Sequence, residues 1–308
     1  MDRIVHISEK GMRLERFLRI HFPTLPPAAR LIGQGRLTVD GRRIRAQDAL
    51  QPGQCVRIAP PAARPASAAG EGASPAAPTP TVSDADRARL AAMTLHEDDD
   101  LLVFDKPAGL AVHAGTRTTD DLDRLLAGLV DAEGERPVLV HRLDKDTSGL
   151  LVAARRKAVA ARLGAAFAGR DVAKTYVAEV EGVPEAAEGV IAAALKKVET
   201  PRGGRMVAAD GDPEARPAET RWRRLAVRPD GASSLLALTP LTGRQHQLRA
   251  HCALIGHPIR GDRLYGRAGS APRLMLHALA IEFDHPAGRH RRFETPWPEP
   301  FGPRPDGL

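Results

Sequence analysis

The chain has 308 residues, 43% of them hydrophobic, and a formal net charge of +7, which suits one large domain or two unequal ones with a buried core. No run approaches the roughly 20 apolar residues of a membrane span, and no secretory signal is visible at the N-terminus. The two cysteines, Cys55 and Cys252, and the 11 histidines show no disulfide or metal-site spacing. We therefore expect a cytoplasmic protein without a metal site.

Positive charge is concentrated at the N-terminus. Residues 1–60 contain 11 Lys and Arg against 5 Asp and Glu, a net charge of +6, whereas the remaining residues carry a net charge of +1. This asymmetry predicts a nucleic-acid-binding appendage on a nearly neutral body. A basic patch for a membrane surface is the competing interpretation, but the segment has the pattern of a folded module, not of a free amphipathic helix.

The first 60 residues contain the signals of two helices, a hairpin and a strand. Leu14, Phe17 and Leu18 have helical spacing within residues 12–22, and a second short helix is predicted at 28–34. An Asp40-Gly41 turn predicts a hairpin from 37–39 back through Ile44, and residues 55–58 form a last strand. This order of elements, a small αα-β module, resembles the RNA-binding module first known from ribosomal small-subunit protein four.

That resemblance implies where RNA would lie. In the module the second helix and the following hairpin contact RNA, and the basic residues at those positions here are Arg30, Arg36, Arg42 and Arg43. Each alone could be a solvated surface arginine. Together they predict phosphate contacts, which give affinity and salt dependence more than sequence recognition.

A low-complexity stretch separates this module from the rest of the chain. Residues 59–81 contain only Ala, Pro, Ser, Gly and Thr apart from Arg64 and Glu71, which predicts a flexible, disordered tether. We therefore expect a small basic RNA-binding module at 1–60, a flexible linker at 61–84 and a second, larger domain at 85–304.

The pattern of residues 85–304 predicts an α+β domain. Strands are expected at 101–104, 110–113, 174–180, 235–238 and 274–283, and helices at 120–130, with Leu122, Leu125, Leu126 and Leu129 on the buried side, and at 156–168. Helices and strands do not alternate strictly, so a mixed, mainly antiparallel central sheet with flanking helices fits better than a doubly wound fold.

The segment from His141 to Gly149 lies between two apolar runs, 138–140 and 150–152, and reads as a loop between strands. Asp144 stands at its centre among cations, which favour the ionised carboxylate that a nucleophile requires. An ordinary solvated connection is the alternative. Asp144 and Asp146 could instead hold Mg²⁺ for phosphoryl transfer, although Lys145 between them opposes a cation site.

A second polar segment runs from Thr239 to His251. Thr242 and Gln245 have capping-box spacing, so a helix is expected to begin there, with Leu248, Cys252 and Ile255 as its apolar stripe. Arg244 then lies in the first helical turn, where a cation opposes the helix dipole and calls for an anionic partner. Asp144 is the natural candidate, and an exposed, unpaired arginine is the alternative.

These segments resemble, in order, the motifs of the Rlu-type pseudouridine synthases, which act on large-subunit ribosomal RNA. The match runs from Lys106-Pro107-x-Gly109 to Leu276-His277-Ala278. The resemblance implies that Asp144 is the catalytic residue, that Arg244 pairs with it, and that Arg142 enters the RNA stack where the target base leaves. Tyr176 would lie over the flipped base, although a tyrosine on a strand is more often an ordinary core residue. Leu276 would form an apolar side of the pocket.

The implied activity is that of an RNA pseudouridine synthase, an isomerase for RNA modification in rRNA processing, with the pseudouridine synthase fold. It would use neither metal nor cofactor, act as a monomer, and have RNA, above all large-subunit ribosomal RNA, as its partner. Whether Asp144 attacks the sugar or the base stays open, and transfer RNA stays possible as substrate. A non-catalytic RNA-binding or ribosome-assembly factor and a metal-dependent nuclease are the other functions to be tested.

Overall fold

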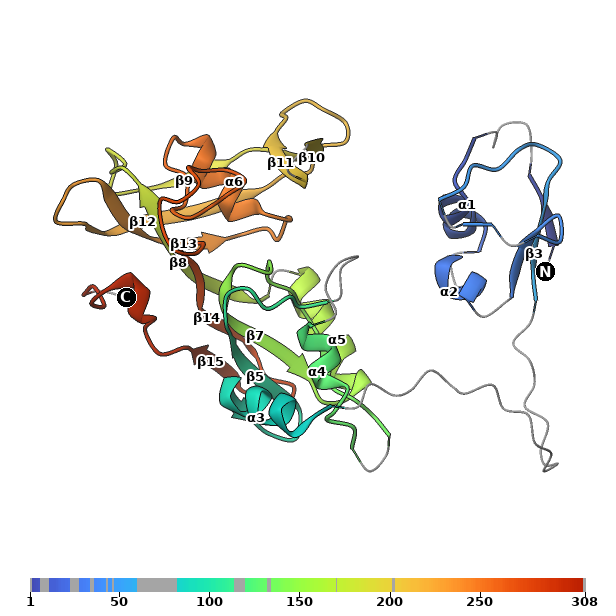
Figure 1. The fold of residues 1–308 in the computed structure, drawn as a ribbon, viewed down its shortest axis with the longest axis horizontal. Coiled ribbons are helices and arrows are strands. Elements are labelled where there is room, and N and C mark those ends of the chain that lie inside the picture. Colours follow the sequence, from blue (N-terminus) through green and yellow to red (C-terminus); the bar gives the residue numbers. More distant parts are fainter. Residues whose placement is uncertain are drawn as a thin grey trace. The chain divides into compact units, whose positions relative to one another are not determined.

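A computed structural model describes residues 2–5, 11–22, 28–33, 36–42, 44–45, 47–59, 82–113, 120–131, 134–169, 171–200 and 203–306 (Figure 1). The chain separates into two compact units, residues 1–74 and 75–308. The predicted linker falls almost wholly outside the described residues. Among the residues that are described, no helix is both long and apolar enough to cross a membrane.

The first unit combines two short helices with a small sheet. Helices α1 (Leu14–His21) and α2 (Ala28–Gly33) pack with strands β1 (Asp2–Ile4), β2 (Leu37–Val39) and β3 (Cys55–Ile58), which form an antiparallel sheet in the order β1-β3-β2. The predicted stripe of Leu14, Phe17 and Leu18 is buried in its core. Both helices and the last strand were predicted, whereas β1 was not.

The predicted hairpin is only partly present. Asp40 and Gly41 turn the chain with positive φ angles of 50° and 78°, and Val39 pairs with Arg42. Among the described residues from 44 to 54, none pairs with β2, and β2 pairs with β3. The Asp40 carboxylate accepts a hydrogen bond from the Cys55 backbone N–H at 2.8 Å, which ties the turn to β3.

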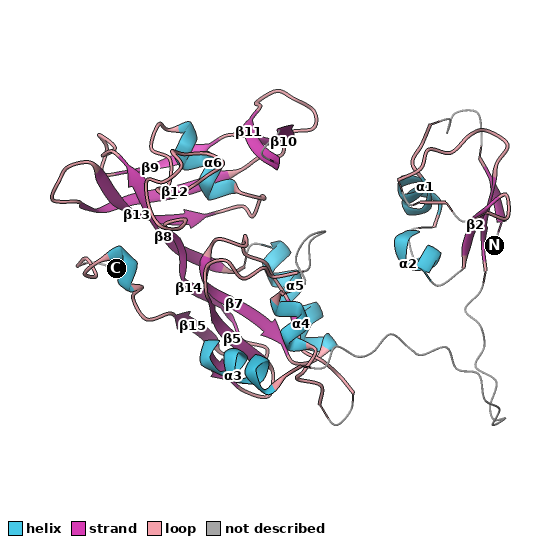
Figure 2. Cartoon of the chain, in the orientation of Figure 1, coloured by secondary structure: helices cyan, strands magenta, loops and turns pink. Residues whose placement is uncertain are grey.

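The second unit is built on one mixed sheet of ten strands (Figure 2). Its main order is β4-β5-β7-β14-β8-β13-β12-β9, with β6 beside β7 and β15 beside β14. Only β7 and β14 run parallel among the described strand pairs of this sheet. The strands are β4 (Thr94–Glu97), β5 (Leu101–Lys106), β6 (Val138–Leu139), β7 (Ser148–Ala154), β8 (Ala173–Glu181), β9 (Glu188–Ala192), β12 (Glu219–Val227), β13 (Ser233–Pro240), β14 (Leu276–Asp284) and β15 (His290–Glu294).

Few helices accompany this sheet, so the fold is α+β as expected. Helices α3 (Asp84–Met93), α4 (Leu122–Leu126) and α5 (Lys157–Gly169) lie at the end that contains β5 and β7, whereas α6 (Gln247–Leu254) lies by β13 (Figure 1). A separate hairpin, β10 (Leu195–Thr200) and β11 (Gly203–Ala208), contacts α6. A short 3-10 helix, η2 (Glu299–Phe301), buries Phe301 near the end of the chain.

The buried residues form two large apolar clusters in this unit. One surrounds β5, β7, α4 and α5, and the other surrounds β8, β13 and α6. Leu122, Leu125 and Leu126 are buried as predicted, but Leu129 is 37% exposed because α4 ends at Leu126. Residues 110–113 form no strand; only Ala111 makes an isolated bridge, to Asp121.

Strand register brings distant motifs together at one place. Gly149 at the start of β7 lies beside Ala278 of β14, and Ala278 in turn lies opposite Tyr176 of β8. The close approach requires glycine, because Gly149 has a φ of 109° and a side-chain Cβ there would lie 2.2 Å from the Ala278 carbonyl oxygen. The loop that carries Asp144 is thereby fixed within reach of Tyr176.

Candidate active site

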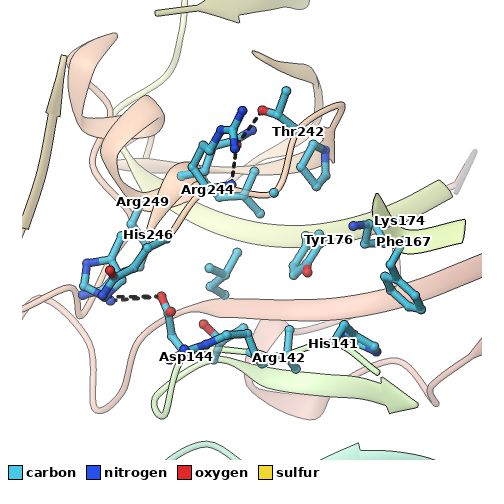
Figure 3. Close-up of a pocket in the computed structure, with 18 residues that line it drawn as sticks. His141, Arg142, Asp144, Phe167, Lys174, Tyr176, Thr242, Arg244, His246 and Arg249 are labelled. Carbon is cyan, nitrogen blue, oxygen red and sulfur yellow. Dashed lines mark hydrogen bonds and ion pairs between the residues drawn. The ribbon is translucent and has the colours of Figure 1, made fainter. Parts of the chain in front are cut away.

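A cavity of about 350 Å³ opens where these strands meet (Figure 3). Its walls come from the 141–147 loop, β8, the start of β14 and the segment from Pro240 to Arg249. The volume lies within the range of small-molecule sites. Asp144, Tyr176, Arg244, Arg142 and Leu276, which the sequence singled out, all line it.

Asp144 is a partly buried carboxylate with one close cationic partner. Its side chain is 22% exposed, and its Oδ2 accepts a hydrogen bond from Arg249 at 3.2 Å. His246 Nε2 lies 3.8 Å from the same oxygen. A guanidinium that donates a hydrogen bond to a carboxylate limits the rotation of that carboxylate.

Arg249 is itself held by a second carboxylate. Asp262, whose side chain has no exposure, accepts hydrogen bonds from Arg249 Nε at 2.7 Å and from its Nη2 at 2.9 Å. This bidentate pair leaves Nη1 for Asp144. Burial disfavours the charged guanidinium, but the two carboxylates outweigh it and raise the pKa of Arg249.

The expected pair between Arg244 and Asp144 is not formed. Arg244 is exposed, and its Nε donates to the Pro217 carbonyl at 3.0 Å. The reason is the start of α6: Thr242 Oγ1 and the Arg244 backbone N–H both donate to the Gln247 side-chain oxygen, so the helix begins at Gln247 and not within residues 242–245. Gln245 is exposed and the predicted capping box is absent. Arg249 therefore lies in the first turn, facing Asp144 (Figure 3).

His246 joins Asp144 to Tyr265. It precedes α6 in a left-handed conformation, with φ 50° and ψ 18°. Its Nδ1 lies 3.2 Å from the Tyr265 hydroxyl, which also accepts from the Met206 N–H at 2.6 Å. Burial lowers the pKa of His246 although Asp144 opposes this, so the ring is neutral near pH 7. If the Tyr265 hydroxyl donates to Nδ1, the ring proton sits on Nε2, facing Asp144.

Tyr176 and Leu276 form the apolar part of the cavity. Tyr176 and Asp144 both line the cavity (Figure 3), and burial together with the Asp144 charge raises the pKa of the Tyr176 hydroxyl. Tyr176 is therefore neutral at ordinary pH. Leu276 is 3% exposed at the first position of β14 and also lines the cavity. Both positions suit contact with the faces of a flat ring.

The far wall contains three residues that the sequence did not single out. The His141 and Phe167 rings stack at 4.6 Å between centroids, and Lys174 Nζ lies 5.4 Å from the Phe167 centroid. His141 Nε2 accepts from the Val152 N–H at 3.0 Å, and burial lowers the pKa of the imidazole to about 3. The neutral ring therefore carries its proton on Nδ1.

A buried lysine, Lys106, binds the backbone of the Asp144 loop. Lys106 is fully buried, and its Nζ donates to the carbonyls of Pro107, Leu110 and Lys145 at 3.0, 2.9 and 3.0 Å. Burial lowers its pKa to about 8. The Lys145 carbonyl also accepts from Gly109 N–H at 2.9 Å, so the Lys-Pro-x-Gly turn and the Asp144 loop form one rigid piece.

The remaining predicted residues lie on the surface or outside the description. Arg142 is exposed at the cavity, and Asp146 is exposed two residues after Asp144. In the first unit Arg42 is exposed, and Arg36 Nε donates to the Ala59 carbonyl at 3.1 Å. The backbone of Arg30 lies in α2, but its side chain and the whole of Arg43 lie outside the described residues.

No group of three or more His, Cys, Asp or Glu side chains is arranged to hold a metal ion anywhere in the described part of the chain. The Asp144 and Asp146 pair thus has no third ligand of these types there. Arg249 lies 3.2 Å from Asp144, and its positive charge opposes the binding of a further cation there.

Comparison with known proteins places this site in a family. Residues 100–254 match the family described as RNA pseudouridylate synthase. Ribosomal large subunit pseudouridine synthase C of Vibrio cholerae is 34% identical over 297 residues, which cover 91% of this chain and 88% of that protein. The protein of the same name from Escherichia coli K12 is 34% identical over 315 residues, covering 96% and 93%.

Solved structures of similar fold support the same family. Human RNA pseudouridylate synthase domain containing 4 has a TM-score of 0.57 at 30% identity and covers 70% of this chain and 92% of its own. Human RNA pseudouridylate synthase domain containing 1 also has a TM-score of 0.57, at 29% identity, and covers 67% and 83%. The chain belongs to the RNA pseudouridylate synthase family and is an RNA pseudouridine synthase.

Proposed function

We propose that Asp144 is the nucleophile that converts a flipped-out uridine to pseudouridine in large-subunit ribosomal RNA. The observation that carries this proposal is the carboxylate itself: Asp144 is 22% exposed, lies at the cavity beside Tyr176, and accepts a hydrogen bond from Arg249. A nucleophilic carboxylate must be oriented and accessible, and the hydrogen bond to Arg249 and the partial exposure support both conditions.

The reaction exchanges one glycosidic bond for another. The bond between N1 of uracil and C1′ of ribose breaks, the base turns, and C5 bonds to C1′. The proton on C5 is lost and N1 gains one, so no group is added and no electron is transferred to an outside acceptor. Asp144 would form a transient bond either to C1′ or to the uracil ring, and both routes use the same carboxylate.

The neighbouring residues have roles that follow from their positions. Arg249, not Arg244, is the cation that orients Asp144, because it makes the hydrogen bond. Tyr176 stacks on the extruded uracil and Leu276 packs against it. Arg142 is exposed next to Asp144 and enters the RNA stack where the base has left, which offsets the few kcal/mol that unstacking requires.

Two observations favour large-subunit ribosomal RNA as the substrate. Relatives that match over more than nine-tenths of this chain are named for that RNA. The first unit also adds a basic surface at which Arg30, Arg36, Arg42 and Arg43 would contact phosphates, as in the ribosomal protein module that it resembles.

Pseudouridine mapping of all RNA from a strain that lacks the protein, beside its parent, tests the substrate. The proposal expects one or more sites in large-subunit ribosomal RNA to be lost, and restored by the wild-type gene. Loss of sites in transfer RNA alone would show that the substrate is transfer RNA and not ribosomal RNA. Loss of no site would favour a non-catalytic role in ribosome assembly. Activity of the purified protein in EDTA excludes the metal-dependent alternative.

A further inference from the structure

A second and larger cavity adjoins the active-site cavity. It has a volume of about 670 Å³ and is lined by residues 167–168 and 171–174, Glu219 and the segment 239–244. The two cavities share six wall residues: Phe167, Lys174, Pro240, Thr242, Gly243 and Arg244. Asp144 and Tyr176 line only the first cavity. None of the roles assigned above uses the second space.

The shared wall carries two cations without a carboxylate partner. Neither Lys174 nor Arg244 has an acidic group within ion-pair distance among the residues that the structure describes. Burial without a counterion lowers the pKa of Lys174. Arg244 is fixed through its Nε to Pro217, so the rest of its guanidinium is free to bind an anion. Each side chain comes from a different element, Lys174 from β8 and Arg244 from the segment before α6.

The part of the second cavity that is not shared with the first contains acidic side chains. Asp171 and Glu219 line it but not the first cavity, and they would repel a further phosphate. Carboxylates accept hydrogen bonds from ribose hydroxyls and from base N–H groups. Phe167, whose ring stacks on His141, adds an apolar edge to the shared wall against which a base can pack.

We propose that the second cavity binds one nucleotide adjacent to the target uridine, and that Lys174 and Arg244 hold the phosphodiester between the two. The proposal rests on the RNA substrate and on the position of Asp144 proposed above. The anion lies at the boundary, where the cations are, and the ribose and base lie beyond it, where the acceptors are. The enzyme would thus fix the register of the RNA strand next to the flipped base.

Single neutral linkages test this arrangement. A stem-loop RNA copied from around a uridine that the wild-type protein converts is made with one methylphosphonate immediately 5′ or 3′ of that uridine. We expect one of these two linkages to lower kcat/KM about tenfold, mainly through KM. The same change three nucleotides away should have a smaller effect.

The variants Lys174→Gln and Arg244→Gln complete the test. Each should lower kcat/KM on the unmodified RNA about tenfold, and the sensitive methylphosphonate should then have little further effect because the variant no longer binds that phosphate. Lys174→Arg should retain most of the activity. Arg162→Gln, an exposed residue on α5, is the matched control and should behave as wild type.

Additive effects of variant and linkage, or variants with unchanged kcat/KM, would overturn the subsite. If thermal unfolding shows that Lys174→Gln does not fold, Arg244→Gln, altered at an exposed residue, gives the same comparison of variant and linkage effects on kcat/KM. A failure of the active-site proposal can be distinguished from a failure of the subsite. In that case the wild type would convert no uridine, or Asp144→Asn would convert uridine as fast as the wild type.

Discussion

At the scale of single residues, the site depends on one arginine that two carboxylates share. Arg249 binds the buried Asp262 through two hydrogen bonds and Asp144 through a third. Removing the guanidinium would therefore remove the partner of the proposed nucleophile and also leave Asp262 charged and unpaired in the interior. The second effect concerns stability and the first concerns catalysis, so the two can be separated.

The variant Arg249→Gln should lose tritium release from uridine-labelled RNA and about 3–5 kcal/mol of unfolding free energy, the usual loss when one partner of a buried pair is removed. The double variant Arg249→Gln/Asp262→Asn should recover part of the stability, measured by urea unfolding, but none of the activity. Recovery of activity in the double variant would show that Arg249 acts only through the fold.

At the scale of elements, the close approach of β7 and β14 sets the position of the Asp144 loop. Gly149→Ala should destabilise the protein by several kcal/mol, because the new Cβ meets the Ala278 carbonyl at 2.2 Å and the φ of 109° is strained for alanine. Gly164→Ala is the matched control: it lies in α5 with nothing within 4 Å of its Cβ, and should gain up to about 1 kcal/mol. If Gly149→Ala and Gly164→Ala had equal free energies of unfolding in urea, this account would be contradicted.

A buried histidine joins the same strands and predicts a pH dependence. His277 of β14 bonds to Ser148 at 2.9 Å and to Thr295 at 2.7 Å. Burial lowers its pKa to about 3, with Arg273 adding to the effect. A folded-state pKa below the unfolded value of about 6.5 gives stability that is present above pH 6.5 and is lost as the pH falls toward 3.

From pH 7 to pH 5 this one residue should remove roughly 2 kcal/mol of unfolding free energy. Urea unfolding at both pH values should show a smaller decrease in His277→Gln than in the wild type, even though the variant is less stable at pH 7 because its hydrogen bonds to Ser148 and Thr295 are weakened. A decrease of the same size in both proteins would show that His277 is not the group responsible.

Sequence patterns predicted most elements but not the partner of Asp144. Apolar spacing located α1 and α4, and alternation located the strand that carries Tyr176, because burial of those side chains is what forms the elements. The segment 239–251 contains two arginines, Arg244 and Arg249. Which one faces Asp144 depends on where α6 begins, and that depends on the Gln247 side chain, which accepts from Thr242 and Arg244.

The sequence assigned no role to four other residues of the site. His141, Phe167 and Lys174 meet only because β8, α5 and the loop before β7 fold together. Lys106 belongs to the Lys-Pro-x-Gly motif, but its burial beneath the Asp144 loop depends on a long-range hydrogen bond to Lys145. The edge strand β9 and its neighbour β12 were not predicted, because each contains a single buried residue, Ile191 in β9 and Thr220 in β12.

At the scale of the whole molecule, charge is divided between the two units. Residues 1–60 carry a net charge of +6, and the rest of the chain a net charge of +1. Deleting residues 1–60 should therefore weaken RNA binding and reduce the slope of log affinity against log salt, by about one for each phosphate that these residues bind. Filter binding of large-subunit ribosomal RNA across a salt series measures both. An identical slope for the full and shortened proteins would mean that this segment binds no phosphates.

The most direct measurement of the central claim compares Asp144→Asn with Asp146→Asn. Bonding of C5 to C1′ releases the C5 hydrogen, so tritium at C5 of uridine in RNA reports turnover. Asp144→Asn should release tritium only at the background rate while it still binds RNA, and Asp146→Asn, altered at an exposed carboxylate two residues away, should keep most of the wild-type rate. Wild-type release by Asp144→Asn would contradict the assignment of Asp144 as the nucleophile.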